Sequence, residues 1–273
     1  MGFPLVLKPT NLSASLFISL NHTQDELLAS YRRLVAEVPR YYQQAAQKGK
    51  KLAIQVEEFM PGSNHSIDCW VDATGHASAT PVVDVLTGKD VGIDDFHHFA
   101  RVTPSRLSRE EQAEASRLAV NGAQALDMST VICHVEFIQT PTGPKLLEIG
   151  ARPGGNRIRI LEMTYGIDQI FAYYQILLGQ SPKVQPEKEQ PSAIVTPFPR
   201  RQGVLHSFHD LDRLRKLPTY CYHEVRGRVG QTVGLAKDGY KAPLYIELTG
   251  ATHDEVHRDV NRIASCDDLI VMQ

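Results

Sequence analysis

The 273-residue sequence has few cysteines, a single tryptophan and no marked excess of either charge. Its cysteines, at positions 69, 133, 221 and 266, are widely scattered without C-x-x-C spacing. This pattern indicates reduced thiols rather than a disulfide framework or a zinc site. The formal net charge of -2 offers no broad basic surface. We therefore expect no nucleic-acid partner.

Long apolar runs are also missing. No stretch approaches the ~18 apolar residues that span a bilayer. The N-terminus lacks the basic segment and apolar core of a secretory signal, so we expect no membrane association and a cytoplasmic location. The composition, with 42% hydrophobic and 22% charged residues, is that of an ordinary globular protein. The length allows two or three lobes around a sizeable core.

The sequence begins on an apolar run with no cap or turn before it. Leu5–Lys8 and Leu16–Leu20 are expected to be short strands joined by a polar loop. Because domains seldom start on a core strand, we expect the chain to begin partway through a larger unit. Strand Leu5–Lys8 would then have an uncovered edge or face.

Three capping boxes mark helix starts, at Thr23 and Glu26, at Ser108 and Glu111, and at Thr252 and Glu255. The first helix is expected to kink at Pro39 and to resume through Tyr41–Gln47. Two more helices are expected over Asp168–Leu178 and Asp210–Leu217. The remaining expected strands are Leu52–Phe59, Ser66–Val71, Pro81–Val85, Val131–Ile138, Lys145–Gly150, Cys221–Val229 and Leu244–Leu248.

Two stretches show no helix or strand period. Thr87–Ser105 contains Asp94, His97 and His98, and a loop this long inside a compact domain is usually functional or disordered. Its histidines either contact a polar substrate group or are solvated. The proline-rich and charged stretch Ser181–Pro191 is the best linker candidate.

Two glutamates dominate the expected hairpin over residues 131–150. Alternation along the first strand places His134 and Glu136 on one face. A five-residue turn over Thr140–Pro144 would set Glu136 opposite Glu148, with Cβ atoms ~5 Å apart, where like charges destabilise each other. Between apolar neighbours, two ionised carboxylates need a divalent cation, or one of them must hold a proton.

The glutamate pair is also compatible with a structure that binds no metal. The hairpin can be a surface feature with two unrelated glutamates. A different strand register would keep the two side chains apart, since register depends on the turn geometry.

Four segments together resemble the ATP-grasp superfamily, in the family's order and over nearly the whole sequence. Gly2–Pro9 resembles the strand that carries a phosphate-contacting lysine, and Gln55–Gly62 resembles the hinge between two nucleotide-gripping lobes. His134–Phe137 and Leu147–Gly155 resemble the metal-binding hairpin. Within the superfamily, the sequence is most similar to carboxylate–amine ligases that include L-amino-acid (dipeptide) ligases. His98–Ser105 is similar to a segment that these ligases place by the substrate.

The resemblance implies an α+β protein with the ATP-grasp fold. Residues 1–57 would be the remnant of the small lobe, the first and incomplete gripping lobe. Residues 58–185 would form the large lobe with the metal-binding hairpin. Residues 186–273 would form a small α+β C-terminal lobe, a size typical of an independent module.

The resemblance also implies ATP and Mg²⁺ as cofactors. Lys8 would contact the phosphates as a point charge, and the Asn11–Ser15 loop would lay N–H groups over them. Residues at the hinge would hold the adenine, and Asp68 lies near the ribose position. The implied nucleotide-binding residues are Lys8, Ser13, Ser15, Glu57, Glu58, Phe59, Met60 and Asp68.

Catalysis in such a site would join a small-molecule carboxylate, activated as an acyl phosphate, to an amine; both substrates are expected to be amino acids. Glu136 and Glu148 would be the metal ligands and would bridge Mg²⁺ to the phosphates. Arg152 would stabilise the acyl phosphate, and Lys8 would assist as the second catalytic residue.

The sequence departs from the family pattern in three ways. The Asn11–Ser15 loop contains no glycine, Gly150 replaces an asparagine that serves many members as a third metal ligand, and Asn64 stands where relatives often have a glutamate. These departures put in doubt the hold on the phosphates, the second metal ion and the contact with the ribose.

The N-terminal domain of the family has no counterpart before Lys8. We therefore expect an N-terminal domain or a partner chain, and a homodimer is an open alternative. Two other functions compete with a ligase. The chain can be a nucleotide-binding fragment or subunit that is catalytically incomplete alone, or a biotin-carboxylase-like component, although no biotin-attachment motif is present.

Overall fold

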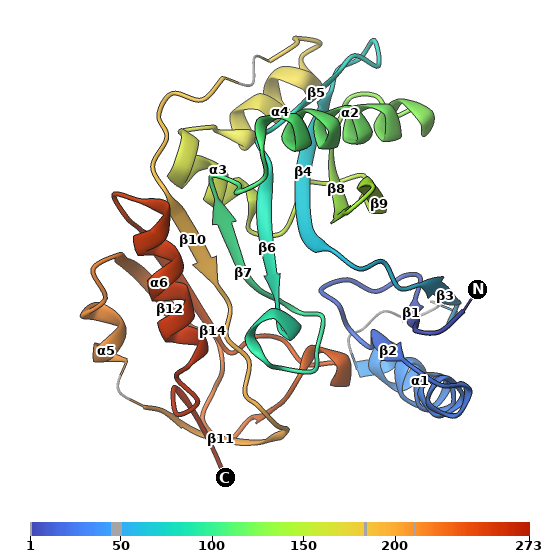
Figure 1. Ribbon diagram of the computed structural model, residues 1–273, viewed down its shortest axis with the longest axis vertical. Coiled ribbons are helices and arrows are strands. Elements are labelled where there is room, and N and C mark those ends of the chain that lie inside the picture. The colour runs from blue at the N-terminus through green and yellow to red at the C-terminus, as the bar shows by residue number, and fades with distance from the viewer. Residues whose placement is uncertain (1, 45–50, 183–184, 210) are drawn as a thin grey trace.

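The computed structural model describes residues 2–44, 51–182, 185–209 and 211–273 (Figure 1). Three β-sheets organise the described chain: one with three strands near the N-terminus, one with nine strands, and one with three strands near the C-terminus. The mixture of helices with antiparallel sheets confirms the expected α+β class. Among the described residues, no helix is long and apolar enough to cross a membrane.

The N-terminal sheet forms the small lobe, with strand order β2-β1-β3. Strand β1 (Leu5–Pro9) lies in the centre, between β2 (Ser19–Asn21) and β3 (Ile54–Glu58). The prediction of an unpaired edge on this strand was therefore wrong. Helix α1 (Gln24–Gln44) packs on the sheet through Leu34, Val38 and Tyr42.

One expectation for the small lobe needs correction. The strand expected over Leu16–Leu20 is shorter and later, because Phe17 adopts a left-handed φ of 61° that interrupts extended backbone. Helix α1 continues through Pro39 as one element up to Gln44. The expected continuation to Gln47 lies partly outside the described residues.

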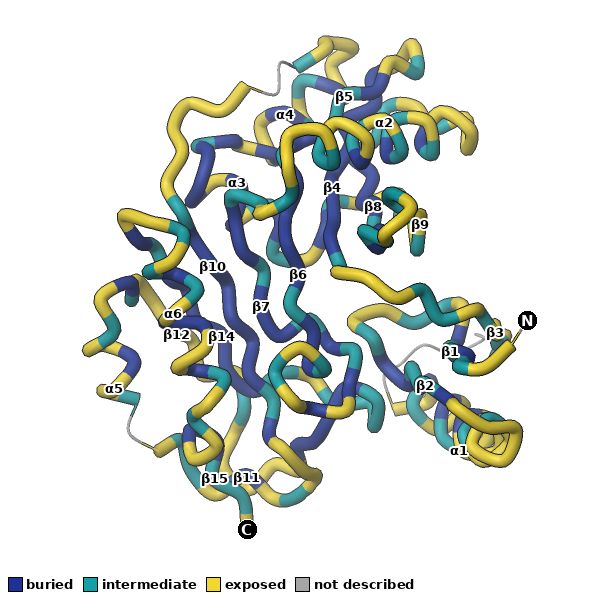
Figure 2. Tube along the Cα trace, in the orientation of Figure 1, coloured by how far each residue is buried: buried dark blue, intermediate teal, exposed yellow. Residues whose placement is uncertain are grey.

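The nine-stranded sheet has the order β12-β14-β10-β7-β6-β4-β8-β9, with β5 paired to β4. Figure 2 shows β10, β7, β6 and β4 buried along most of their length. The strands are β4 (Ser63–Val71), β5 (Ala77–Ala79), β6 (Val83–Thr87), β7 (His98–Thr103), β8 (Val131–Thr140), β9 (Gly143–Gly150), β10 (Ser192–Val195), β12 (Tyr220–Val225) and β14 (Leu244–Thr249).

Helices cover both faces of this sheet. On one face, helix α2 (Arg109–Ala125) packs its alanines on Cys69, Cys133 and neighbouring side chains. The opposite face carries α3 (Arg157–Tyr165) and α4 (Gln169–Leu177), packed around Trp70 and Ile132. Helix α6 (His253–Ala264) closes a further core with β10 and β14. Each strand between these layers therefore presents alternate residues to two different cores.

The β8–β9 hairpin sets Glu136 opposite Glu148, which confirms the predicted pairing. The geometry that produces it differs from the five-residue turn expected. Thr140 pairs with Gly143, so only Pro141 and Thr142 connect the strands. The register then shifts by one residue between Glu136 and Phe137, and this bulge restores the pairing of the two glutamates.

Part of the expected loop over Thr87–Ser105 is regular structure. It contains the 3₁₀ turn η1 (Lys89–Val91) and strand β7, which is buried inside the large sheet. Helix α3 was not expected from the sequence. It begins after Asn156, which has a left-handed φ of 62° and makes no side-chain cap, so it carries no capping signal.

The C-terminal residues contribute strands to two sheets. Strands β10, β12 and β14 extend the same sheet as β4 and β6–β9, so that sheet crosses the boundary expected at 185 and 186. Strands β11 (Gly203–Phe208), β13 (Thr232–Val233) and β15 (Ile270–Met272) form the third sheet. The remaining short elements are α5 (Asp212–Arg215) and η2 (Ala236–Asp238).

The predicted capping boxes at Ser108 and Thr252 are both confirmed, with the Glu111 and Glu255 carboxylates accepting from the cap backbone. At the start of α1 the pattern is altered. Thr23 accepts from the N–H of Glu26, but the Glu26 carboxylate accepts from His22 instead of Thr23. All three boxes still satisfy backbone donors at a helix start.

The half-buried His257 on α6 makes stability depend on pH. Burial, and then the charges of Arg106 and His253, lower its pKa from near 6.5 to about 4. Between these values the unfolded chain binds more protons than the folded chain, so the free energy of unfolding falls as the pH drops through this window. We predict that His257→Gln reduces this fall in urea titrations at pH 7, 5.5 and 4. The exposed His22→Gln is the control, and equal slopes for both variants would contradict the assignment.

Candidate functional site

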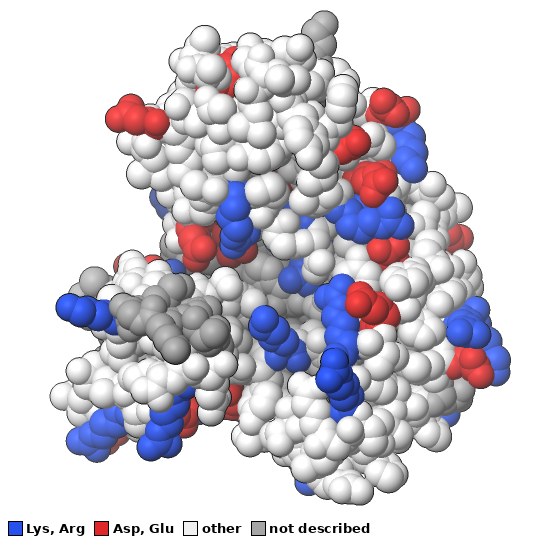
Figure 3. Space-filling view, turned by 180° about the vertical axis from the view of Figure 1, so that it is seen from behind, with Lys and Arg blue, Asp and Glu red and all other residues white. Residues whose placement is uncertain are grey.

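The candidate site lies where the small lobe faces the hairpin of the large sheet. In the view from behind, a hollow separates the small lobe from the rest of the molecule, and basic side chains gather around its mouth with acidic ones beside them (Figure 3). Strands β8 and β9 bring the glutamate pair to the large sheet's side, and β1 brings Lys8 from the small lobe.

The two glutamates influence one another electrostatically. Burial and then the charge of Glu136 raise the pKa of Glu148, while Lys8 and Arg152 act in the opposite direction. Lys8, Arg152 and Glu148 are thus close enough to interact, although they come from three separate segments. A carboxylate with a raised pKa beside a second carboxylate is a place where a cation is favourable.

Glu136 lies between two histidines. Its Oε1 atom is 3.0 Å from Nε2 of His134 and 3.9 Å from Nε2 of His98. Burial alone would raise the pKa of Glu136, but the two histidines and Arg157 hold it below its usual range. Burial lowers the pKa of His98 to about 3, so this imidazole is neutral near pH 7.

Asp68 holds His134 and the turn at Gly154 in place through hydrogen bonds. Its Oδ1 lies 2.6 Å from Nδ1 of His134, and its Oδ2 accepts from the N–H of Gly154 at 3.1 Å. Burial lowers the pKa of His134, but its hydrogen bonds to Asp68 and Glu136 outweigh this and leave it raised. The expected contact of Asp68 with a ribose needs correction, because its side chain is fully buried and already bonded. Asp68 instead positions His134 and the glycine turn.

Two further arginines, which the sequence did not assign to the site, contact its residues. Arg157, the first residue of α3, is 1% exposed and donates to Ser66 Oγ and to the Gly155 carbonyl. Arg101 on β7 donates to the His98 carbonyl and to Thr196 Oγ1. The sequence signal for Arg157 was its place two residues after Gly155. For Arg101 it was the substrate-side segment that resembled the ligases.

The predicted catalytic residues Lys8 and Arg152 both lie at the site. Lys8 forms an ion pair with Glu57, with Nζ and Oε1 2.8 Å apart, and its side chain is 13% exposed. Arg152 is exposed and donates to the carbonyl of Pro153. Glu57 therefore supports Lys8, which is a different role from the adenine contact that the resemblance implied.

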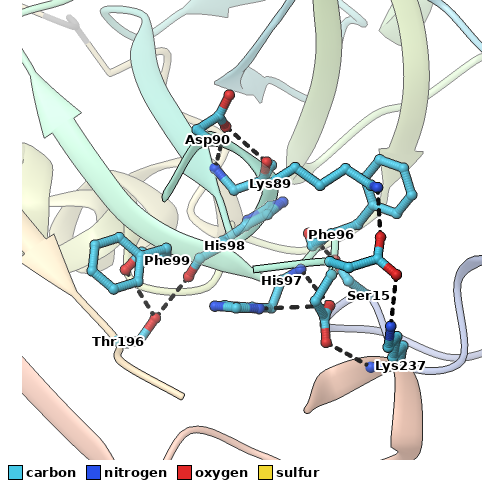
Figure 4. Close-up of polar contacts among 12 residues, drawn as sticks. Ser15, Lys89, Asp90, Phe96, His97, His98, Phe99, Thr196 and Lys237 are labelled. Carbon is cyan, nitrogen blue, oxygen red and sulfur yellow. Dashed lines mark hydrogen bonds and ion pairs between the residues drawn. The ribbon is translucent and has the colours of Figure 1, made fainter. Parts of the chain in front are cut away.

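The phosphate-loop candidates lie at the junction of the lobes. Ala14, Ser15 and Phe17 all have left-handed φ angles, which produces a tight turn without glycine. Ser15 donates to the carbonyl of Phe96 at 2.9 Å, across to the large lobe (Figure 4). Ser13 is exposed and accepts from the N–H of Leu16 through its carbonyl. The side chain of Ser15 is thus engaged, while that of Ser13 lies open.

The segment expected to be the hinge links the two sheets. Glu58 ends β3, and Phe59 and Met60 follow it before β4 begins at Ser63. The N–H of Phe59 donates to the carbonyl of Pro4, which ties the segment to the start of the small lobe. Phe59 and Met60 are half-buried, whereas Glu58 is exposed.

The polar residues of the loop before β7 point to different surroundings, and only some of them lie near the site. Asp94 lies between the ammonium groups of Lys89 and Lys237, and Asp95 accepts from the Lys237 backbone (Figure 4). His97 is buried against Phe198, with ring centroids 4.1 Å apart. Of the residues that the sequence singled out in this loop, His98 is therefore the one beside Glu136.

The donor set fits Mg²⁺ with two protein ligands. In the described ranges, no group of three or more histidine, cysteine, aspartate or glutamate side chains is arranged to hold a metal ion. Gly150 pairs with His134 in the hairpin and brings no side chain. Mg²⁺ commonly uses one or two carboxylates and completes its octahedron with water and substrate phosphates. Glu136 and Glu148 meet that requirement.

The buried contacts of Asp68 generate a stability prediction. Asp68→Asn removes the charge that holds His134 and replaces one acceptor with a donor, so we expect the free energy of unfolding to fall by roughly 1–3 kcal/mol. Urea unfolding measures this loss. The exposed Asp127→Asn is the matched control, and a loss no larger than that of the control would contradict the positioning role.

Comparison with known proteins identifies relatives of the chain. A family model described as an ATP-grasp domain matches residues 1–159. Carnosine synthase 1 of Gallus gallus is 31% identical over 140 residues, which are 51% of this chain and 14% of that protein. D-alanine–D-alanine ligase of Desulfotalea psychrophila is 27% identical over 168 residues, which are 59% of this chain and 48% of that protein.

A solved structure matches the fold over the whole chain. The L-amino acid ligase of Bacillus licheniformis superposes with a TM-score of 0.81 at 18% identity, over 100% of this chain and 65% of that one. The chain thus spans less than two thirds of each of these relatives. Because the family model covers more than half of the chain, and the expected motifs lie in its fold, this protein belongs to the ATP-grasp domain family.

Proposed function

We propose that this chain is the nucleotide-binding and catalytic part of an ATP-dependent carboxylate–amine ligase. The observation that carries the proposal is the cross-strand pair Glu136 and Glu148, which lies beside Lys8 and Arg152 where the small lobe meets the large sheet. Two relatives are named as ligases of amino acids, which supports the same chemistry here. Residues 1–57 and 58–185 are the two gripping lobes, and 186–273 complete the large sheet.

In this proposal ATP lies between the lobes. Lys8 faces its phosphates, with Glu57 holding the lysine in place, and the turn at Ser13 and Ser15 covers the phosphate tail. The backbone of Glu58, Phe59 and Met60 receives the adenine edge. Closure of the lobes would exclude water, which strengthens each electrostatic contact with the phosphates.

Glu136 and Glu148 would hold Mg²⁺, which neutralises charge on the phosphates during phosphoryl transfer. The hydrogen bond from His134 and the charge of Arg157 keep Glu136 ionised. The γ-phosphoryl group passes to the substrate carboxylate, and attack by the amine then releases inorganic phosphate. Arg152 provides the positive charge that stabilises the oxyanion of this second step.

A second candidate is a subunit that needs an N-terminal domain or a partner chain. Leu28, Tyr31 and Val35 form an exposed apolar stripe on α1. Exposed apolar patches of this kind mark surfaces that another domain covers. A homodimer through such a surface is the alternative.

All four cysteines are free thiols, which supports a cytoplasmic location.

Lys8 tests the nucleotide assignment. We predict that Lys8→Ala weakens ATP binding by roughly tenfold or more, because a charge-assisted contact to phosphate is lost, while adenosine binding changes little. Calorimetric titration of both ligands measures the difference. Lys145→Ala, an exposed lysine on β9, is the control. Equal losses for ATP and adenosine would show that Lys8 does not face the phosphates.

Glu148 tests the function itself. The full-length gene product that contains this chain is assayed for release of ADP and phosphate against a panel of amino acids. We predict turnover that Glu148→Gln abolishes without loss of folding, because one of the two metal ligands is removed. Glu114→Gln, an exposed glutamate on α2, should keep turnover. Near-normal turnover of Glu148→Gln would overturn the metal assignment.

A further inference from the structure

Arg157 keeps one buried donor without a partner. Its Nε and Nη1 atoms donate to Ser66 and to the Gly155 carbonyl, at 2.8 and 2.9 Å. Its Nη2 atom is buried and has no hydrogen-bond partner in the part of the chain that the structure describes. A buried guanidinium with an unsatisfied N–H is costly, which makes this donor a place where an acceptor from outside the chain would be favourable.

Arg101 has the same feature on a neighbouring strand. Its Nη1 is occupied by His98 and Thr196, but its Nε is buried without a partner among the described residues. Burial, and then the charge of Arg157, lower the pKa of Arg101 to about 9. In the described chain, neither arginine forms an ion pair with a carboxylate. Glu136 is an opposite charge near both arginines, but in that part of the chain it forms an ion pair with neither of them.

The sheet places both arginines over one face. Arg101 pairs with Val85, and Val85 pairs with Asn64. Asn64 lies two residues before Ser66, which bonds to Arg157 and pairs with Glu136. Directly paired residues and residues two apart share a face. Arg101, Ser66 and Glu136 are therefore neighbours on the face that α3 covers.

Arg157 and Arg101 differ from Lys8 in the carboxylate that they act on most directly. Lys8 and Arg152 act on the pKa of Glu148, whereas Arg157 and His98 act on that of Glu136. The charges that act on Arg101 include those of Arg157, Glu136, Tyr245 and Arg226. Arg157 in turn is affected by Glu136, Asp68 and Arg152. We therefore expect Lys8 and Arg152 to serve the nucleotide phosphates, and Arg101 together with Arg157 to serve a second anion next to them.

We propose that Arg157 and Arg101 form a buried anion subsite beside Glu136 that binds a carboxylate group of the substrate. Two separate N–H donors match the two oxygens of a carboxylate. His98 links the subsite to Glu136, since its carbonyl accepts from Arg101 and its Nε2 lies 3.9 Å from Oε1 of Glu136. That the anion belongs to a ligase substrate rests on the proposed function; the binding of an anion does not.

Thermal unfolding of the 273-residue chain tests the subsite with acetate as the probe, at constant ionic strength. We expect the midpoint to rise along a saturating curve in acetate, and not in acetamide, its neutral analogue. Arg157→Met and Arg101→Met should each raise the acetate dissociation constant by roughly 10- to 100-fold, the effect of losing a charged hydrogen bond. The exposed Arg109→Gln is the matched control and should titrate like the unsubstituted chain.

The outcomes separate this proposal from the ligase proposal. Saturation by acetate that both methionine variants lose supports the subsite, even if the chain binds no Mg·ATP. Absence of saturation, an equal response to acetamide, or unchanged titration of Arg101→Met would overturn it, and Arg101→Met decides the matter if Arg157→Met does not fold. Saturation by inorganic phosphate alone would instead assign these arginines to the nucleotide.

Discussion

The candidate site depends on the direct pairing of Glu136 with Glu148 across an antiparallel hairpin. Like charges in such a position destabilise the strands unless something positive stands between or beside them. The surrounding residues supply that charge from three directions: Lys8 from the small lobe, Arg152 from the glycine turn and Arg157 from the start of α3. The requirement for compensating positive charge therefore brings distant segments together and gives the hollow between the lobes its chemical character.

The same requirement explains the buried polar residues beneath the hairpin. Asp68 bonds to His134 and to the Gly154 backbone, so one buried carboxylate fixes both Glu136 and the turn that carries Arg152. Across the hollow, Ser15 bonds to Phe96 and Phe17 bonds to Ala236, which holds the small lobe against the large one.

The sequence was informative where a local pattern decides the structure. Alternation on residues 131–138 predicted the shared face of His134 and Glu136, and the capping boxes predicted three helix starts. It failed where distant contacts decide. Strand β7 lacks a clear period because both faces are covered, and the partners of Asp68 lie 66 and 86 residues away. The burial of Arg157 likewise follows from the packing of α3 on the sheet, which no local pattern encodes.

The central claim is that Glu136 and Glu148 hold a divalent ion against the nucleotide phosphates. Electron paramagnetic resonance of Mn²⁺, used in place of Mg²⁺, tests it most directly with ATP labelled by ¹⁷O at the β- and γ-phosphates. The account predicts a protein-bound Mn²⁺ signal that the label broadens and that the double variant Glu136→Gln and Glu148→Gln lacks. A Mn²⁺ signal that the label does not broaden, or that persists unchanged in the double variant, would contradict it.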